Sequence, residues 1–426
     1  MSRTGERQPF DPARLAEVYR AEAPRCLATL VRVLGDVDRA EEALADAFAV
    51  AAERWPTSGV PPNPGGWITT TARNRAIDRI RRESTRGARQ AEAHGLLDLR
   101  RDSAGEQSMI DDLGDLDVVP DDQLRLVFLC CHPALAREAQ VALTLRLVAG
   151  LATPEIARAF LVPEATMAQR LVRAKNKIRH NRIAYRVPSP AELPDRLAPV
   201  LATIYLVYNE GHTASAGPDL LRTDLAAEAV RLARLLADLM PDEPEAVGLL
   251  ALLLLSEARR PARTRPDGGL VRLADQDRSR WDRALIAEGH ELVRRCIRRN
   301  APGPYQIQAA IAAVHADAPT ADATDWGQVV TLYDQLLALG PNPVVALNRA
   351  VALAERDGPA AGLAAIDAVA ADLPRYHLLH AARAELLARL GRNGDAAAAF
   401  DQALELTANE AERRHLRLRR AAFDER

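Results

Sequence analysis

The stretch that decides the fold reads TPEIARAFLVPEATMAQRLVRAKNKIR and spans residues 153–179. It begins with Thr153, a hydroxyl N-cap, followed by a proline at the first helical position, so a helix is expected to start there. Pro163 ends this helix, and a second helix is expected from Glu164 to about Tyr185. Two short helices separated by so tight a break predict a helix-turn-helix.

Positive charge is concentrated in the second of these helices. Residues 164–186 hold seven Lys and Arg residues against one acid, and the chain's only two lysines, Lys175 and Lys177, are among them. Such a helix can simply face water, but clustered cations also attract DNA phosphates. The DNA-binding residues predicted on this helix are Glu164, Thr166, Gln169, Arg170, Arg173, Lys175, Lys177 and Arg179.

A further basic helix lies nearer the start of the chain. Residues 71–89 hold seven arginines and two acids, and four charged residues there share one helical face, namely Arg75, Asp78, Arg79 and Arg82. The helix is expected to begin at Trp67, after a loop rich in proline and glycine at residues 56–66, and to end near Glu83. Its charge suits contact with nucleic acid, and Trp67 suits either a stacked base or the protein core.

An acidic helix precedes this basic helix. Residues 36–53 contain six acids. Three of them lie at helical spacing beside two large apolar residues, giving the set Glu41, Glu42, Asp46, Leu44 and Phe48. Negative charge repels phosphate, so this helix suits a protein partner rather than DNA.

The rest of the chain also favours helices. Residues 98–122 hold nine acids against two arginines, which predicts a solvated linker before helical signals return at Asp121. Towards the end, Arg349 and Arg383 begin matching segments 34 residues apart. That period is typical of tetratricopeptide (TPR) repeats. Alternating strand patterns are absent from the sequence, so the expected fold class is all-α.

Together these segments carry a family resemblance. Asp36–Phe48 (DVDRAEEALADAF) resembles the acidic helix of bacterial sigma factors that docks on the β′ clamp of RNA polymerase. Trp67–Arg82 (WITTTARNRAIDRIRR) resembles the segment that opens and reads the −10 element, and Glu164–Arg179 resembles the recognition helix of region 4, which reads the −35 element. The order and spacing resemble the extracytoplasmic-function (ECF) type, in the subgroup with a large C-terminal TPR-like extension.

This resemblance implies a domain organisation and a set of partners. The implied domains are sigma region 2 at 10–83, a flexible acidic linker at 84–119, sigma region 4 at 120–186, a helical extension at 187–320 and TPR-like repeats at 321–426. The implied partners are core RNA polymerase through its β′ clamp and β flap, promoter DNA, and a peptide or protein for the TPR-like repeats. A cytoplasmic, non-enzymatic protein without cofactor, metal or membrane contact is expected.

The resemblance also assigns residues to these roles. The −10 element is expected to contact Trp67, Arg73, Asn74, Arg75, Asp78, Arg81 and Arg82. Core polymerase is expected to contact Asp38, Glu41, Glu42, Leu44, Asp46 and Phe48. On the −35 helix, Thr166, Gln169, Arg170 and Arg173 are expected to face bases, whereas Lys175, Lys177 and Arg179 hold phosphates. Arg179 alternatively packs near the β flap.

Two features depart from the family pattern. Leu161 stands in the turn where region 4 usually has glycine, and Pro163 replaces the usual hydroxyl N-cap. Core packing is the simplest account of Cys130 and Cys131, which have no second ligand pair nearby. A helix C-cap is the simplest account of Gly211.

Two other function classes stay open. A helix-turn-helix activator with a TPR scaffold would explain the DNA-binding helix, but it has no use for the acidic helix and the segment 67–82. An enzyme with a site in residues 188–320, around Glu210 and His212, is the third class. No Ser-His-Asp set, phosphate loop or HExxH motif supports it.

Overall fold

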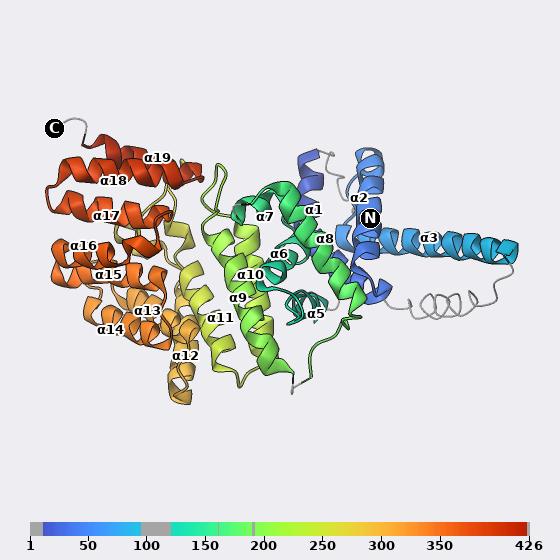
Figure 1. Ribbon diagram of the computed structural model, residues 1–426, viewed down its shortest axis with the longest axis horizontal. Helices are drawn as coiled ribbons and strands as arrows, with labels where there is room; N and C mark the ends of the chain where they lie inside the picture. Colours follow the sequence, from blue (N-terminus) through green and yellow to red (C-terminus); the bar gives the residue numbers. More distant parts are fainter. Residues whose placement is uncertain (1–11, 95–120, 161, 190–191, 424–426) are drawn as a thin grey trace, which may run out of the picture. The chain divides into compact units, whose positions relative to one another are not determined.

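The computed structural model describes residues 12–94, 121–160, 162–189 and 192–423. Within these ranges the chain is helical, and pairing between extended segments is limited to isolated bridges (Figure 1). The all-α prediction is confirmed. The chain divides into two compact units, Met1–Thr203 and Ile204–Arg426, with the division inside helix α9 (Leu193–His212). Among the described residues, no helix has the length and apolar composition that crossing a bilayer requires.

The first unit contains two groups of helices. Its helices are α1 (Pro12–Leu34), α2 (Val37–Ser58), α3 (Pro64–His94), α5 (Asp121–Cys130), α6 (Arg137–Leu147), α7 (Thr153–Ala159) and α8 (Glu164–His180). Leu30, Trp55 and Ile68 bring one fully buried side chain each from α1, α2 and α3 into a shared core. Asp36 caps α2, because its carboxylate accepts a 2.9 Å hydrogen bond from the Arg39 amide.

The connection between α2 and α3 is shorter than the sequence predicts. Helix α2 continues through Pro56 to Ser58, and α3 already begins at Pro64, so the expected loop at 56–66 shrinks to five residues, 59–63. Proline at the start of α3 loses no intrahelical hydrogen bond, because the first amides of a helix have no partner. Helix α3 also continues past Glu83 to His94, so the first part of the predicted linker is helical. Residues 95–119 of that linker lie outside the described residues.

The helix-turn-helix forms with a different cap. Helix α7 begins at Thr153, but the capping position is Ala152, whose amide donates a 2.7 Å hydrogen bond to the Glu155 carboxylate. A carboxylate reaching back from the first turn thus satisfies the amide of the residue before the helix, as one half of a capping box does. Helix α8 begins directly after Pro163 and ends at His180, earlier than Tyr185. Leu161 lies outside the described residues.

The second unit is a succession of helices, each packed on the next (Figure 1). After the second half of α9 come α10 (Thr223–Leu239), α11 (Pro244–Glu257), α12 (Arg283–Arg299), α13 (Pro304–Asp317), α14 (Trp326–Leu339), α15 (Pro343–Asp357), α16 (Pro359–Val369), α17 (His377–Arg389), α18 (Asn393–Leu406) and α19 (Glu410–Ala421). Short 3₁₀ turns are η2 (Arg260–Ala262), η3 (Leu273–Asp275), η4 (Arg278–Arg280) and η5 (Ala370–Asp372). Buried clusters around Trp281, Val329 and Phe400 follow one another along it.

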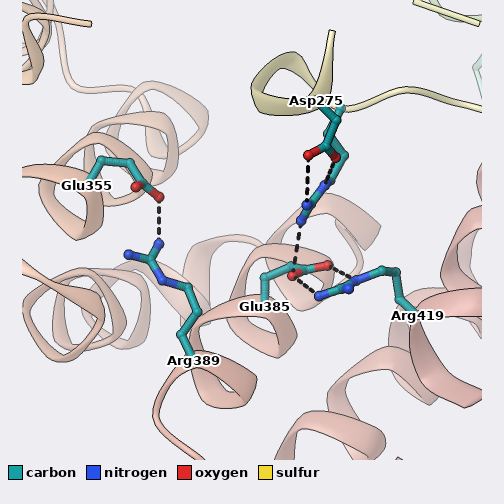
Figure 2. Close-up of polar contacts among 6 residues, drawn as sticks. Asp275, Glu355, Glu385, Arg389 and Arg419 are labelled. Carbon is teal, nitrogen blue, oxygen red and sulfur yellow. Dashed lines mark hydrogen bonds and ion pairs between the residues drawn. The ribbon is translucent and has the colours of Figure 1, made fainter. Parts of the chain in front are cut away.

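Ion pairs 34 residues apart link alternate helices of this unit. Figure 2 shows Glu355 of α15 with Arg389 of α17, and Glu385 of α17 with Arg419 of α19. The non-helical segment before η3 joins this network, because Arg272 contacts both Asp275, at 2.7 Å, and Glu385, at 3.4 Å. The TPR-like repeats stay a prediction, and the recurring pair agrees with their 34-residue period.

The last helix is fastened to the beginning of the same unit. The buried Asn409 side chain caps α19 and donates hydrogen bonds to the carbonyls of Ala214, at 3.0 Å, and Asp219, at 2.8 Å. The Glu410 amide donates to the Gly217 carbonyl at 2.9 Å. A repeat array normally contacts only its neighbours, so these bonds add a long-range closure to the second unit.

Gly211 has a packing role rather than the predicted capping role. It lies inside α9, which continues to His212, and a Cβ placed on it would come 2.4 Å from the Ala226 amide nitrogen of α10. Backbone atoms on a neighbouring helix cannot yield as a flexible side chain can. Glycine is therefore required here for close helix packing.

We expect Gly211→Ala to lower the free energy of unfolding by about 1–3 kcal/mol, because overpacking forces the two helices apart. Thermal denaturation followed by circular dichroism measures the change. Gly394→Ala is the matched control, since a Cβ there meets no atom within 4 Å. Equal melting temperatures for the two variants would contradict the packing role.

Candidate nucleic-acid interface

Helix α8 has one buried and one open face. Four apolar residues at helical spacing are buried, namely Met167, Leu171, Ala174 and Ile178. Of the predicted DNA-binding residues, Glu164, Gln169, Arg173, Lys177 and Arg179 are exposed, whereas Thr166, Arg170 and Lys175 are half-buried. The Arg173 guanidinium donates a 3.2 Å hydrogen bond to the Gln169 amide oxygen. Donors suited to base edges and phosphates thus gather on one face.

Helix α3 presents a second, partly open set. Asn74, Arg75, Asp78 and Arg82 are exposed. Arg73 is half-buried, and its buried Nε has no hydrogen-bond partner. Trp67 is also half-buried, with its ring centroid 5.4 Å from that of the buried Trp55, so part of its surface belongs to the core. The side chain of Arg81 lies outside the described part of the chain.

Arg79 of α3 joins the acidic helix. Its guanidinium forms ion pairs with Glu42 and, at 2.9 Å, with Asp46. Glu42 and Asp46, two of the carboxylates predicted to bind a protein partner, are therefore already paired with Arg79. The sequence placed Arg79 on the charged face of α3 but gave no sign of this pairing.

The two apolar residues predicted for the same partner are buried. Leu44 is 5% and Phe48 is 8% exposed, and the Phe48 ring meets Tyr19 edge-on with centroids 4.8 Å apart. Both side chains support the packing of α2 on α1. Of the residues on α2 that were predicted to bind polymerase, only the carboxylates are therefore left to contact a partner.

The other carboxylates of α2 hold the end of α8. Lys175 Nζ lies 2.8 Å from both Asp38 Oδ1 and Glu41 Oε2. Arg179 pairs with Asp38 and, at 3.1 Å through Nε, with Asp36. These residues are more than 130 positions apart in sequence, and only complementary charge hinted at their meeting.

A buried cluster joins α1 and α5 beside this contact. The Asp122 side chain is 1% exposed and pairs with Arg32 of α1, at 2.9 Å, and with Arg125, at 3.1 Å. The Tyr185 hydroxyl, just beyond α8, lies 2.8 Å from the Ala28 carbonyl and 2.7 Å from the Asp122 carbonyl. Burial, followed by the charge of Asp122, raises the pKa of Tyr185, so the phenol stays protonated and can donate.

The residues considered as metal ligands or as part of an enzyme site are buried or hydrogen-bonded within the protein. Cys130 and Cys131 are buried, and burial raises the pKa of both thiols. His212 has a lowered pKa, through burial and then the neighbouring Arg263, and its Nδ1 lies 3.3 Å from the Tyr208 hydroxyl. Glu210 accepts a hydrogen bond from the Ser215 amide at 3.2 Å. Within the described residues, His, Cys, Asp and Glu form no group of three that could hold a metal ion.

Three family models match the chain. Sigma-70 region 2 matches residues 18–86, and Sigma-70 region 4 matches residues 125–178. A family of unknown function (DUF6596) matches residues 196–297. The chain belongs to the sigma-70 family, as an ECF-like sigma factor with a large extension. Such factors are non-enzymatic, and their partners are core RNA polymerase and promoter DNA.

A relative is similar in sequence over most of the chain. The protein of Rhizobium meliloti (strain 1021) named "Uncharacterized protein R00370" is 43% identical over 395 residues, which are 93% of this sigma factor and 92% of the relative. Because the alignment covers 93% of this chain, it includes most of the extension.

We expect Tyr185→Phe to destabilise the first unit of this sigma factor by about 1 kcal/mol, because a partly buried hydroxyl loses its hydrogen bonds. Urea denaturation measures the loss. Tyr19→Phe is the control, since the Tyr19 side chain is 37% exposed and its ring contact with Phe48 is kept. A loss as large in the control would show that Tyr185 has no special role.

Proposed function

We propose that this sigma factor binds core polymerase through the carboxylates of α2, reads the −35 element with α8 and contacts the −10 element with α3. The observation that carries the proposal is the open basic face of α8 within a region 4 match. In this assignment the polymerase-binding residues are Asp38, Glu41, Glu42 and Asp46.

Roles on α8 divide along the helix. Gln169 is exposed in its first half and Arg173 just past its middle, and the early residues of the second helix reach base edges in a helix-turn-helix. Lys175, Lys177 and Arg179 follow in the second half, and point charges there suit phosphates, which fix position rather than sequence. Thr166 and Arg170 also lie in the first half of α8 and are proposed to read bases as well.

On α3, single-stranded bases are proposed to meet Asn74 and the open part of Trp67. A stacked aromatic ring and an amide that bonds base edges are the groups that hold unpaired bases. Arg75 and Arg82 supply positive charge to the backbone. The half-buried Trp67 limits stacking to the part of its ring that Trp55 leaves open.

The activator alternative differs from the sigma function in the form of RNA polymerase that the protein acts on. An activator stimulates a holoenzyme that already contains a sigma factor, whereas a sigma factor makes core polymerase itself specific. We therefore expect the purified chain plus core polymerase to start transcription at defined sites on genomic DNA fragments. Initiation only after a second sigma factor is added would support the activator.

In that assay Arg173→Ala should cost about 1–3 kcal/mol in promoter binding and relax the preference at one −35 base pair. Start-site sequencing and DNA-binding titrations measure both effects. Arg137→Ala removes an exposed arginine from α6, outside the proposed interface, and should leave both unchanged. Equal losses on promoter and random DNA for Arg173→Ala would refute base reading.

The extension is proposed to tune this activity and not to read DNA. A cavity of about 310 Å³ between α15, α17 and α19 is lined mainly by apolar groups, among them Val351, Leu378, Ala381 and Leu416. Cavities of this size and character hold ligands or side chains of partners. The peptide or protein predicted as partner of the TPR-like repeats is proposed to bind here.

Shortening the chain tests this regulatory role. A cut after Val187 also removes the half of α9 that holds α5 through the Cys131 and Thr203 side chains, 3.3 Å apart, so it should lower stability by itself. A chain ending at Thr213 keeps that contact. We expect it to bind core polymerase and to differ from the full chain in transcription. Equal transcription at equal polymerase occupancy would contradict regulation by the extension.

A further inference from the structure

Three arginines of the second unit lie close together around two short helices. Arg259 directly precedes η2, Arg263 directly follows it, and Arg278 begins η4, which contacts η2. Burial, followed by the charge of Arg259, lowers the pKa of Arg263 to about 10. Burial also lowers the pKa of Arg259, and the charge of Arg278 lowers it further. The three cations are therefore near enough to repel one another.

Two of these arginines are held by backbone carbonyls at helix ends. Arg263 donates a hydrogen bond to the carbonyl of His212, the last residue of α9. Arg278 donates to the carbonyls of His315, in the last turn of α13, at 2.5 Å, and of Ala318, just beyond it, at 2.7 Å. The C-terminus of a helix carries a partial negative charge and commonly binds arginine in this way. These bonds orient both guanidinium groups but do not neutralise them.

Arg259 has no such support. Its side chain is half-buried, and its buried Nε forms no hydrogen bond with any residue that the structure describes. The ionisable groups that act on it are Tyr208, Arg278 and Tyr333, and no carboxylate is among them. Both tyrosines stay neutral, because burial raises the pKa of each. A cation held partly out of water without a counter-charge is costly, so Arg259 is a candidate for binding a negatively charged ligand.

The acids around the cluster have basic neighbours of their own. Glu257 and Glu412 both act on Arg263. Glu257 forms an ion pair with Arg260, and Glu412 lies 3.3 Å from the His377 ring. Within the described ranges of the chain, neither acid forms an ion pair with any of the three cations. The cluster therefore keeps an excess of positive charge.

The surroundings of the cluster also contain buried nitrogens that lack hydrogen-bond partners. The Arg278 guanidinium lies over the Trp281 ring, 4.7 Å from its centroid, and the buried Trp281 Nε1 has no acceptor among the described residues. Burial, followed by the charges of Arg259 and Arg278, lowers the pKa of His315 to about 4, so this ring is neutral at pH 7. Its buried Nδ1 has no described partner either. A ligand with several acceptor oxygens suits such an environment.

We propose that Arg259, flanked by Arg263 and Arg278, binds a phosphate group, either as the free ion or as the monoester of a small molecule. The guanidinium group presents its donors in a planar fork that matches the oxygens of phosphate. Three cations without a directly paired acid favour a doubly charged phosphate over a singly charged carboxylate. Arg259 and Arg263 are only half-buried, so a ligand can reach them from solvent.

Bound phosphate would connect several helices of the second unit. Arg263 and Arg278 already bind the ends of α9 and α13, and Arg259 lies just beyond the end of α11. A ligand that binds all three cations therefore stabilises the packing of these helices, by an amount set by its concentration and affinity. This effect depends on the chain alone and does not rest on the function proposed above.

The first experiment titrates the full chain with inorganic phosphate in a calorimeter, with sodium chloride of equal ionic strength as the blank. We expect one site with a dissociation constant of about 1 mM or lower. Arg259→Met keeps an apolar stem but removes the donors, and should weaken binding at least about tenfold. Arg375→Met removes the same charge from an exposed position and should bind as the natural chain does.

Three results would overturn the proposal at this step. They are no binding of phosphate to the natural chain, equal binding by Arg259→Met, and an equal loss in Arg375→Met. Arg259→Lys is a second variant, which keeps the charge but not the planar fork. It should bind phosphate about three- to tenfold more weakly, and unchanged binding would overturn the role of the guanidinium group.

The second experiment measures melting temperature by differential scanning calorimetry of the full chain. Saturating phosphate should raise the melting temperature of the natural chain by about 2–6 °C and leave that of Arg259→Met unchanged. Without phosphate, Arg259→Met should melt at the same temperature or higher, because it removes a charge that no protein group compensates. A melting temperature several degrees lower in the absence of phosphate would assign Arg259 a structural role and overturn the proposal.

Two further ligands identify the source of the phosphate group. Tighter binding of glycerol 3-phosphate than of inorganic phosphate would assign the site to a phosphate monoester, whereas equal or weaker binding would assign it to the free ion. Succinate, which carries two carboxylates, tests the argument from charge. Binding of succinate as tight as that of phosphate would overturn the assignment to phosphate. All of these measurements omit polymerase, so their outcome is independent of whether the chain directs transcription.

Discussion

The first unit depends on one buried carboxylate, that of Asp122. A buried charge is costly unless it is paired, and removing one partner of such a group destabilises a protein by about 3–5 kcal/mol. Arg32 from α1 and Arg125 from α5 supply that pairing. The Tyr185 hydroxyl lies within hydrogen-bond distance of two backbone carbonyls, that of Ala28 in α1 and that of Asp122 itself. The cluster thereby fixes region 2 and region 4 against each other. The acidic end of α2 and the end of α8 come together as a result.

The second unit is also held together by bonds between residues that are far apart in sequence. Stacked helices leave an open end at each terminus, and Asn409 closes the second unit by binding the segment around Gly217. Arg272 ties the long segment between α11 and α12 to Glu385. Both bonds join residues more than 100 positions apart. Besides the packing of neighbouring helices, the second unit therefore has long-range bonds that a simple repeat array lacks.

The basic helix proposed to bind DNA and the acidic surface proposed to bind polymerase are also complementary to each other. The field that steers each towards its partner attracts the two surfaces together when both partners are absent. In this sigma factor that attraction has a defined geometry, with Lys175 between two carboxylates. Glu42 and Asp46, one helical turn away, face Arg79 instead. The acidic helix is thus divided between two basic helices, and only one of its two contacts involves region 4.

The sequence by itself determined what depends on local spacing: the all-α class, the two basic helices, and the break at Pro163 after which α8 begins. Clustered charge and proline breaks act over one or two turns, so they can be read directly. It did not reveal that Pro56 stays within α2, that Leu44 and Phe48 are buried, or that Gly211 admits the backbone of Ala226. The pairing of Lys175 with Asp38 and Glu41 was equally hidden. Those features arise where distant segments meet, and only the tertiary structure decides which of many complementary charges and apolar faces come into contact.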